Sequence, residues 1–326
     1  MKPFPSWICA ALVAAAAWVA PPGLAQTYPA KPITFVVPFP PGGSQDGMAR
    51  LFGKRIHEEL GQPVIVVNKP GAGGGIGALS VARAPADGYT FLVTSNGPVN
   101  IIPSLYKTAG YSGRDFAGVG MFFTAPFFLL VPASSPFKTV QELLEHGRRK
   151  NVPLNYGSTG SGNMSQIASE MINLAAGTAF VHIPYKGGAP LTTALIAGEV
   201  QWALQQSVDA QPQVSAGRMR PLAVLSLKRS EPWPQVPAMA ELGIHGLETE
   251  SWSGLVAPAG TPRAVIALMN QTINRILQEP AVAGRLRDVG ATPGMPNNTP
   301  EGFDALLARE TALFAKAIRE GNIKAD

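Results

Sequence analysis

The chain has 326 residues, of which 46% are hydrophobic and 14% are charged, and its formal net charge is +5. This length and apolar fraction suit one large domain or two medium ones with packed cores, and they exclude a low-complexity chain. The basic residues are dispersed, so we expect no nucleic-acid-binding surface, and the small positive excess favours anionic small ligands.

The first 25 residues differ from the rest. A short basic start precedes an almost unbroken apolar run over residues 7–20, and small residues near Ala25 suit a cleavage site. The run is shorter than the roughly 20 residues that span a bilayer, which argues against a membrane anchor. We therefore expect a signal peptide over residues 1–25 and export to the periplasm. The only cysteine, Cys9, lies in this leader, so the chain from Gln26 onward would contain no disulfide and no catalytic thiol.

Beyond Ala30, short β-rich runs alternate with amphipathic helices, which is typical of α/β layers with parallel strands. The strands that we expect are 33–38, 64–68, 90–94, 127–131, 154–156, 180–184, 200–206, 222–226 and 253–257. Glycines at the ends of periodic segments predict where helices stop, as at Gly61, Gly177 and Gly198. Thr139 and Glu142 have the spacing of a capping box at a helix start.

The last 70 residues are mostly helical, with starts predicted at Thr261-Pro262 and Thr299-Pro300. A helical tail cannot form a sheet of its own, so it should pack back on the first block. The sequence therefore predicts a first lobe of residues 26–122 and 249–326 and a second lobe of residues 123–248. Two crossovers, near residues 120–125 and 247–251, would join them.

Four loops share one design, in which a strand end is followed by glycine with serine or threonine and then by a helix. They are residues 39–46, 69–77, 94–96 and 156–163. Such loops gather at the carboxyl edge of parallel strands, where their N–H groups attract anions. One loop alone is weak evidence because tight turns use glycine for steric reasons. Together, the four predict an anion site.

A dinucleotide site is the first alternative. Gly73, Gly75 and Ala78 fit the G-x-G-x-x-A pattern after a strand. The next strand ends in Thr94-Ser95-Asn96, without the acidic residue that binds the ribose, so we expect no nucleotide cofactor.

A hydrolase is the second alternative. Ser161 stands in Gly-Ser-Gly and not in the five-residue nucleophile elbow. The expected loops bring none of the histidines, at positions 57, 146, 182 and 245, near a nucleophile and an acid, and none has the spacing of a metal ligand. We therefore predict no catalytic residue, no metal site and no enzyme activity.

The loop motifs also resemble a known family, the Bordetella-uptake-gene (Bug) solute receptors of tripartite tricarboxylate transporters. The matching stretches follow the order of that family along nearly the whole chain after the leader. They are residues 38–43 (PFPPGG) with Asp46, Ala49 and Arg50; 68–74 (NKPGAGG); 156–158 (YGS) with Gly160, Gly162 and Glu170; 182–187 (HIPYKG); Gly217 with 222–224 (LAV); and 257–262 (APAGTP).

The resemblance implies a two-lobed, type II-like periplasmic-binding-protein fold (a Venus flytrap), a periplasmic location and the membrane subunits of such a transporter as partners. It also implies a small carboxylate ligand, held largely by backbone amides of the first lobe. The residues that would bind the ligand carboxylate are Pro40, Gly42, Ser44, Gln45, Asp46, Ala72 and Gly73. Specificity would come from Ser95, Ser158, Thr159, Ser161 and Ser207, and the ligand-binding set also includes Phe39 and Gln166.

Three positions depart from the family pattern. Gln166 stands where many relatives have His, Gln201 where they have Asp, and Ile102 where they have Asn. The ligand therefore stays open among dicarboxylates, tricarboxylates, amino acids and aromatic acids. A periplasmic sensor that feeds a signalling system, or less favourably a hydrolase, remains an alternative function, and we expect a monomer.

Overall fold

The computed structural model describes residues 28–149, 154–230, 233–244 and 250–320, and one compact unit begins at Lys31. The expected signal peptide, its cleavage position at Ala25, His245 and crossover residues 247–249 lie outside the described residues.

The strands form a mixed sheet in the order β2-β1-β3-β9-β4-β7-β5-β6, with β8 and β10 also paired to β4. Their bounds are β1 Ile33–Val37, β2 Val64–Asn68, β3 Thr90–Thr94, β4 Phe116–Pro132, β5 Asn155–Ser158, β6 Val181–Pro184, β7 Trp202–Gln206, β8 Met219–Val224, β9 Glu250–Pro258 and β10 Thr292–Pro293. Strand β1 is parallel to β2 and β3, and β5 is parallel to β6 and β7, so each parallel group presents a carboxyl edge.

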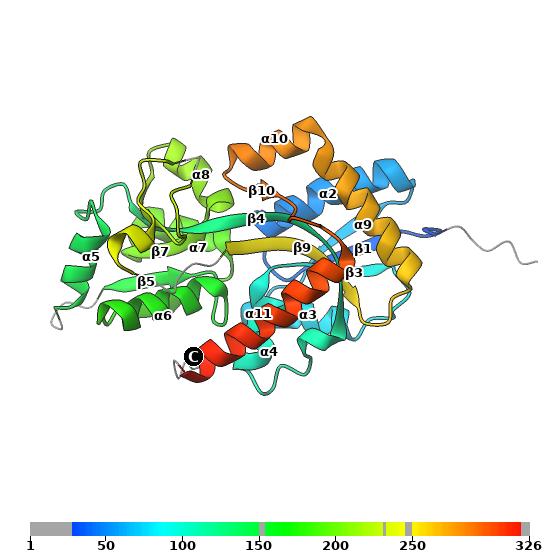
Figure 1. Cartoon of the computed structure of the whole chain (residues 1–326), viewed down its shortest axis with the longest axis horizontal. Coiled ribbons are helices and arrows are strands. Elements are labelled where there is room, and N and C mark those ends of the chain that lie inside the picture. The colour runs from blue at the N-terminus through cyan, green and yellow to red at the C-terminus, as the bar shows by residue number, and fades with distance from the viewer. Residues whose placement is uncertain (1–27, 150–153, 231–232, 245–249, 321–326) are drawn as a thin grey trace, which may run out of the picture. The chain divides into compact units, whose positions relative to one another are not determined.

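Two long antiparallel strands connect the parallel groups. The first 11 residues of β4 pair with β9, and its later residues pair with β7 and β8. Figure 1 shows β4 and β9 side by side between the two groups. The sequence predicts a strand only at 127–131 and a crossover at 120–125, but both belong to the single strand β4. We call the part with β1–β3 the first half and the part with β5–β8 the second half. The predicted lobe boundaries at 122/123 and 248/249 stay predictions.

The helices end largely where the sequence predicts. Gly61, Gly177 and Gly198 adopt left-handed conformations at the ends of α2, α6 and α7, and Thr139 forms its capping box with Glu142. The α-helices are α2 Ser44–Leu60, α3 Gly75–Ala82, α4 Ile102–Leu105, α5 Val140–Gly147, α6 Met164–Ala176, α7 Gly188–Ala197, α8 Ser207–Ser215, α9 Arg263–Gln278, α10 Pro280–Asp288 and α11 Pro300–Glu320. Shorter turns are η1 Ala72–Gly74, η3 Gly113–Asp115 and η4 Met239–Leu242, and η2 Gly97–Ile101 is a π-helix.

The cores lie on both faces of the sheet. In the first half, Trp252 and Phe303 pack edge to face and join a buried cluster with Val36 and Leu92. In the second half, Tyr156 stacks on Trp202 inside a second cluster. Helix α9 contacts α2, and both α9 and α11 pack on β4, so the helical tail returns to the first half, as its lack of strands predicts. In the part of the chain that the structure describes, no helix is both long and apolar enough to span a bilayer.

Candidate functional site

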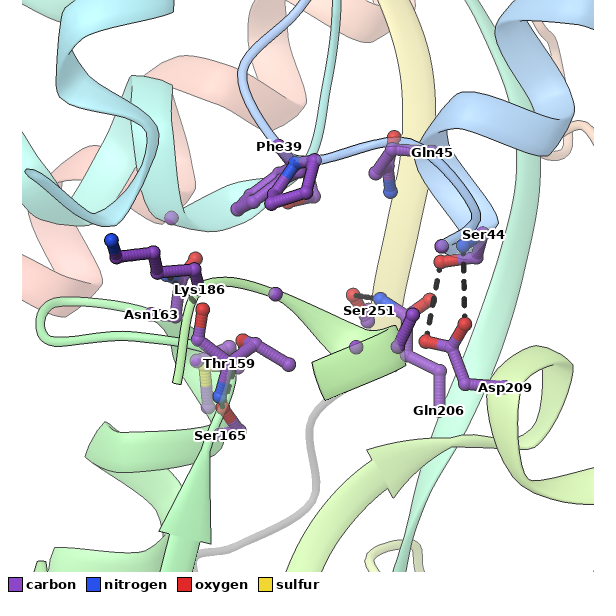
Figure 2. A pocket seen from close by; sticks show the side chains of 18 of the residues that line it. Phe39, Ser44, Gln45, Thr159, Asn163, Ser165, Lys186, Gln206, Asp209 and Ser251 are labelled. Atoms are coloured by element: carbon purple, nitrogen blue, oxygen red, sulfur yellow. Dashed lines mark hydrogen bonds between the residues drawn. The ribbon is translucent and has the colours of Figure 1, made fainter. Parts of the chain in front are cut away.

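A cavity of about 50 Å³ lies where the carboxyl ends of both parallel strand groups meet. Its walls are the loops that follow β1, β3, β5, β6 and β7 (Figure 2). The lining residues are Phe39, Pro40, Gly43, Ser44, Gln45, Ser95, Asn96, Gly97, Phe127, Thr159, Asn163, Met164, Ser165, Lys186, Gly187, Gly188, Ala189, Pro190, Gln206, Asp209 and Ser251.

Four α-helices begin at this cavity. The first residues of α2, α6 and α7 line it, and so do Gln206, immediately before α8, and Asp209 in its first turn. The first turn of a helix leaves backbone N–H groups without carbonyl partners and carries about half a positive charge from the helix dipole. Helix starts from both halves therefore give the cavity a positive field that suits an anion.

The charged side chains lie at opposite ends of the cavity. Among the described residues that line it, Lys186 is the only cation and Asp209 the only acid. Figure 2 places Lys186 beside Asn163 and Thr159, and it places Asp209 on the other side with Ser44 and Gln206. The cavity thus has a donor-rich end and an acceptor-rich end.

The structure brings part of the predicted binding set to this cavity. Phe39, Pro40, Ser44 and Gln45 line it from the first half, together with Ser95 at the end of β3. Thr159 lines it from the second half, where its hydroxyl and the hydroxyl of Ser165 lie 3.0 Å apart.

Asp46 and Gly42 do not line this cavity, and Asp46 instead holds the loop that does. Its carboxylate accepts hydrogen bonds from Arg50 at 2.9 and 3.0 Å, from Asn68 Nδ2 at 3.0 Å and from Gly42 N–H at 3.1 Å. Burial alone would raise the pKa of Asp46, but these hydrogen bonds outweigh it and lower the pKa. Asn68 Nδ2 also donates to the carbonyl of Phe39 at 3.0 Å, so the pair fixes the course of residues 39–46.

Ala72 and Gly73 also lie outside the lining, at a contact between the two halves. Asn163 Nδ2 donates to the carbonyl of Gly73 at 3.3 Å, and a Cβ added at Gly73 would overlap the carbonyl oxygen of Ser161. Gly73 has a φ of +62°, which favours glycine on conformational grounds as well. The neighbouring Gly74 lies against Pro38, so residues 71–75 and 38–46 are on the same side of the molecule.

Ser158 and Gln166 belong to a buried hydrogen-bond network around His182. Ser158 Oγ lies 2.7 Å from His182 Nε2, a serine–histidine contact that the expected loops did not predict. Sequence reasoning missed the pair because the two residues are 24 positions apart and meet only through the parallel pairing of β5 with β6, in which Tyr156 lies opposite His182 and Ser158 opposite Pro184. Gln166 Oε1 accepts from Gly162 N–H at 2.7 Å, so its amide nitrogen faces His182 Nδ1 at 3.2 Å as a donor.

The contacts with Gln166 and Ser158 favour one tautomer of the neutral imidazole. Because His182 Nδ1 accepts from Gln166, the ring proton lies on Nε2 and is donated to Ser158 Oγ. Ser158 is fully buried, is absent from the cavity lining, and accepts a further hydrogen bond from Gly160 N–H. The network shapes the loop at 160–162.

The two remaining predicted residues, Ser161 and Ser207, contact the opposite half and not the cavity. Ser161 lies against Gly73, and Ser207 Oγ donates to the carbonyl of Gly290 at 2.9 Å.

The predicted binding set omits several lining residues. Lys186 and the glycines that follow it belong to a fifth loop of the same strand–glycine–helix design, after β6, and that design could have identified them. Gln206 and Asp209 have no such signal, because Gln206 is the last residue of β7 and Asp209 follows that strand in a segment without glycine. Ser251 lies on β9 and reaches the site only through the pairing of β9 with β4.

Asp209 closes the acceptor-rich end by reaching across to the first half. Its carboxylate accepts from Ser44 N–H at 3.1 Å and from Ser44 Oγ at 3.3 Å. Desolvation by burial raises the pKa of Asp209 to about 6, although both hydrogen bonds from Ser44 act in the opposite direction. This contact also borders an outer cavity of about 430 Å³, which shares Gly43, Ser44, Ala189 and Asp209 with the inner one.

The described residues give no sign of a metal centre, since no three His, Cys, Asp or Glu side chains among them are grouped so that they could hold an ion. The chemistry that the site offers is hydrogen bonding from helix starts and polar side chains.

Comparison with known proteins shows which family the chain resembles and which fold it shares. A model of the tripartite tricarboxylate transporter family receptor matches residues 48–318. Protein BugT of Bordetella pertussis is 35% identical over 312 residues, covering 95% of each chain. A structure from R. palustris solved with adipate is 34% identical, covers 91% of this chain and 99% of that one, and has a TM-score of 0.86. The periplasmic binding protein BugD is 32% identical, with 92% and 100% coverage and a TM-score of 0.86. The expected periplasmic-binding-protein fold is thereby confirmed.

Proposed function

Because the chain belongs to the tripartite tricarboxylate transporter receptor family, we propose that it captures a small carboxylate in the 50 Å³ cavity and delivers it to the membrane subunits of such a transporter. Receptors of this family are periplasmic solute-binding proteins. Export through a signal peptide cleaved near Ala25, and action as a monomer without a catalytic step, are parts of the same proposal.

One observation carries the proposal. The first turns of helices α2, α6, α7 and α8 meet at a single cavity, with Lys186 at one end. Backbone N–H groups at helix starts hold a carboxylate without a buried counter-ion, and they are already oriented before the ligand arrives. The likeness to the R. palustris protein solved with adipate agrees with this ligand class.

Ligand entry requires the halves to separate. In the structure, Ser44 contacts Asp209 and Gly73 contacts Ser161, so both contacts bridge the halves beside the cavity. A carboxylate that enters when these contacts are open gains hydrogen bonds from the second half on closure, and it thereby stabilises the closed arrangement. The transporter would then receive the ligand by reopening the same contacts.

A thermal-shift screen of dicarboxylates, tricarboxylates, amino acids and aromatic acids tests the proposal. A ligand at about a hundredfold excess over its Kd should stabilise the fold by about 2.7 kcal/mol. Failure of every carboxylate in the screen to shift the Tm would contradict the proposal, and so would turnover of a bound carboxylate that is lost on changing Ser158→Ala.

Variants at two lysines locate the site. Lys186→Met removes the one cation among the described lining residues and should weaken carboxylate binding only roughly threefold to tenfold, because the Lys186 side chain is exposed to solvent. Lys69→Met is the matched control, since Lys69 follows β2 and does not line the cavity. Isothermal titration measures both, and equal effects of the two changes would place the carboxylate elsewhere.

A further inference from the structure

The acceptor-rich end of the cavity is defined by a chain of hydrogen bonds that begins at Trp252. The indole Nε1 can only donate, and it donates to Glu310 Oε2 at 2.8 Å. Asn96 Nδ2 donates to the same oxygen at 2.9 Å, which turns Asn96 Oδ1 toward Ser251 as an acceptor. Ser251 Oγ donates to that oxygen at 3.2 Å, so the hydroxyl must accept its other hydrogen bond.

Gln206 supplies that other hydrogen bond. Its Nε2 donates to Ser251 Oγ, and this fixes the orientation of the amide, because a flipped amide would place an acceptor against an acceptor. Gln206 is 9% exposed and lines the cavity, and its Oε1 is buried with no hydrogen-bond partner among the described residues. An acceptor in that position costs free energy unless a donor reaches it.

Asp209 lies one helical turn further along the chain, at the same end of the cavity. Each of its carboxylate oxygens accepts one hydrogen bond from Ser44, which leaves at least one lone pair on each for a further donor. The donor-rich end is formed by Lys186 and the starts of α6 and α7. The cavity is therefore bipolar, and a ligand with two carboxylates would place one of them against acceptors.

We propose that the bound carboxylate also carries a protonated amine, which Gln206 Oε1 and the Asp209 carboxylate hold while Lys186 and the starts of α6 and α7 hold the carboxylate. The ligand class is thus an amino acid or a related zwitterion. This inference rests on the proposed function and narrows its ligand.

Because Asp209 ionises, the proposed binding of the amine should depend on pH. The charged groups that face Asp209 across the two cavities are Lys186 in the inner one and Arg285, from α10, in the outer one; no other described ionisable side chain lines either. Burial raises the pKa of Asp209 to about 6, and a bound ammonium group would lower it again. Amine binding should therefore release protons near pH 6 and weaken as the pH falls below that value.

Matched pairs of probes test the inference by isothermal titration at about pH 7.5. The pairs are L-glutamate with glutarate, L-aspartate with succinate, and L-leucine with 4-methylpentanoate. In the pair that fits the cavity best, the amino member should bind about tenfold more tightly than its analogue. Tighter or equal binding of the analogue overturns the inference and leaves the proposed function standing, whereas binding by no probe contradicts both.

The variant Asp209→Asn distinguishes a role of Asp209 in binding the ligand amine from a role in holding the fold. Asparagine keeps the size of the side chain and can still accept from Ser44 N–H, so the fold should remain. We expect the preference for the amino member to fall to within about threefold, with the affinity of the analogue maintained or increased. Proton release near pH 6, measured in buffers of different ionisation heat, should disappear. A purely structural role would weaken both members of a pair equally and would overturn the inference. Asp288→Asn, at an exposed position at the end of α10, is the control.

Discussion

Asp209 is an acid whose lost hydration is compensated only by the hydroxyl and N–H groups of Ser44 in the described structure. The raised pKa means that the folded state prefers the protonated form of this side chain. Unfolding returns the carboxyl to its ordinary pKa, near 3.8. The contribution of Asp209 to stability is therefore favourable at low pH and is lost as the pH rises from about 4 to about 6.

Because the ionised form of Asp209 destabilises the folded state, we predict that Asp209→Asn stabilises the protein in neutral and mildly alkaline solution. The gain in Tm without ligand should be largest near pH 8, where the native side chain is ionised, and should shrink toward about pH 4.5. Thermal unfolding at several pH values measures it, with Asp288→Asn as the exposed control. A gain that is the same at every pH would contradict the assignment of the desolvated charge to Asp209.

Single residues also show where sequence reasoning stops. The loop at 39–46 could be predicted as part of the site because proline, glycine and serine mark it locally. Gln206 and Asp209 could not, since their role comes from contacts with Ser251 and Ser44, which are 45 and 165 positions away. Gln201 illustrates the same limit, because its Oε1 accepts from Asn155 N–H at 2.8 Å and so holds β5 beside β7.

At the scale of elements, the contact between turn η1 and the loop before α6 bridges the two halves. Gly73 and Ser161 meet there through backbone atoms, and Ile102 at the start of α4 lies near both Gly73 and Gly162. Backbone contacts of this closeness leave no room for a side chain, so the contact depends on glycine.

Gly73→Ala should therefore disrupt this bridging contact and lower the Tm. The added Cβ would meet the Ser161 carbonyl and Ile102, in a backbone conformation that already disfavours alanine, so we expect a loss of about 1–3 kcal/mol. Gly284→Ala is the matched control, because Gly284 lies inside α10 with open space around it and should gain about 0.5–1 kcal/mol. Denaturant unfolding measures both changes, and a neutral Gly73→Ala would show that the contact does not hold the halves together.

Helix ends were more predictable than strand lengths for a physical reason. A left-handed glycine such as Gly61 ends a helix through its own backbone, whatever surrounds it. The length of β4 depends instead on the partners along its two edges, and the apolar run from Phe116 to Pro132 becomes one strand because β9 pairs with its first part and β7 and β8 with the rest.

At the scale of the whole compact unit, β4 and β9 join the two halves of the sheet. Strand β9 pairs with β3 of the first half and with the first part of β4, and the rest of β4 pairs with β7 and β8 of the second half. Neither half can lose its strands without exposing β4, whose residues are buried along nearly its whole length. We therefore expect one cooperative thermal transition, with a calorimetric enthalpy close to the van't Hoff enthalpy. Scanning calorimetry checks this, and two resolved transitions would contradict it.

The alternation of strands and helices sufficed to predict the α/β class and the return of the helical tail, because both follow from local periodicity. The bipolar character of the site is a property of the assembled chain. Lys186 and Asp209 lie in separate loops of the second half, and only the folded sheet places them at opposite ends of one cavity.

The position of β9 in the sheet also has a consequence for how the chain acquires its structure. The strands of the second half, β4 to β8, lie in one continuous stretch and can pair as soon as residue 224 has emerged. The first half, although it begins the chain, lacks its strand between β3 and β4 until Glu250–Pro258 has emerged. A chain that appears amino end first would thus complete its later half before its earlier one, and the open edge of β3 would need protection from aggregation during that interval.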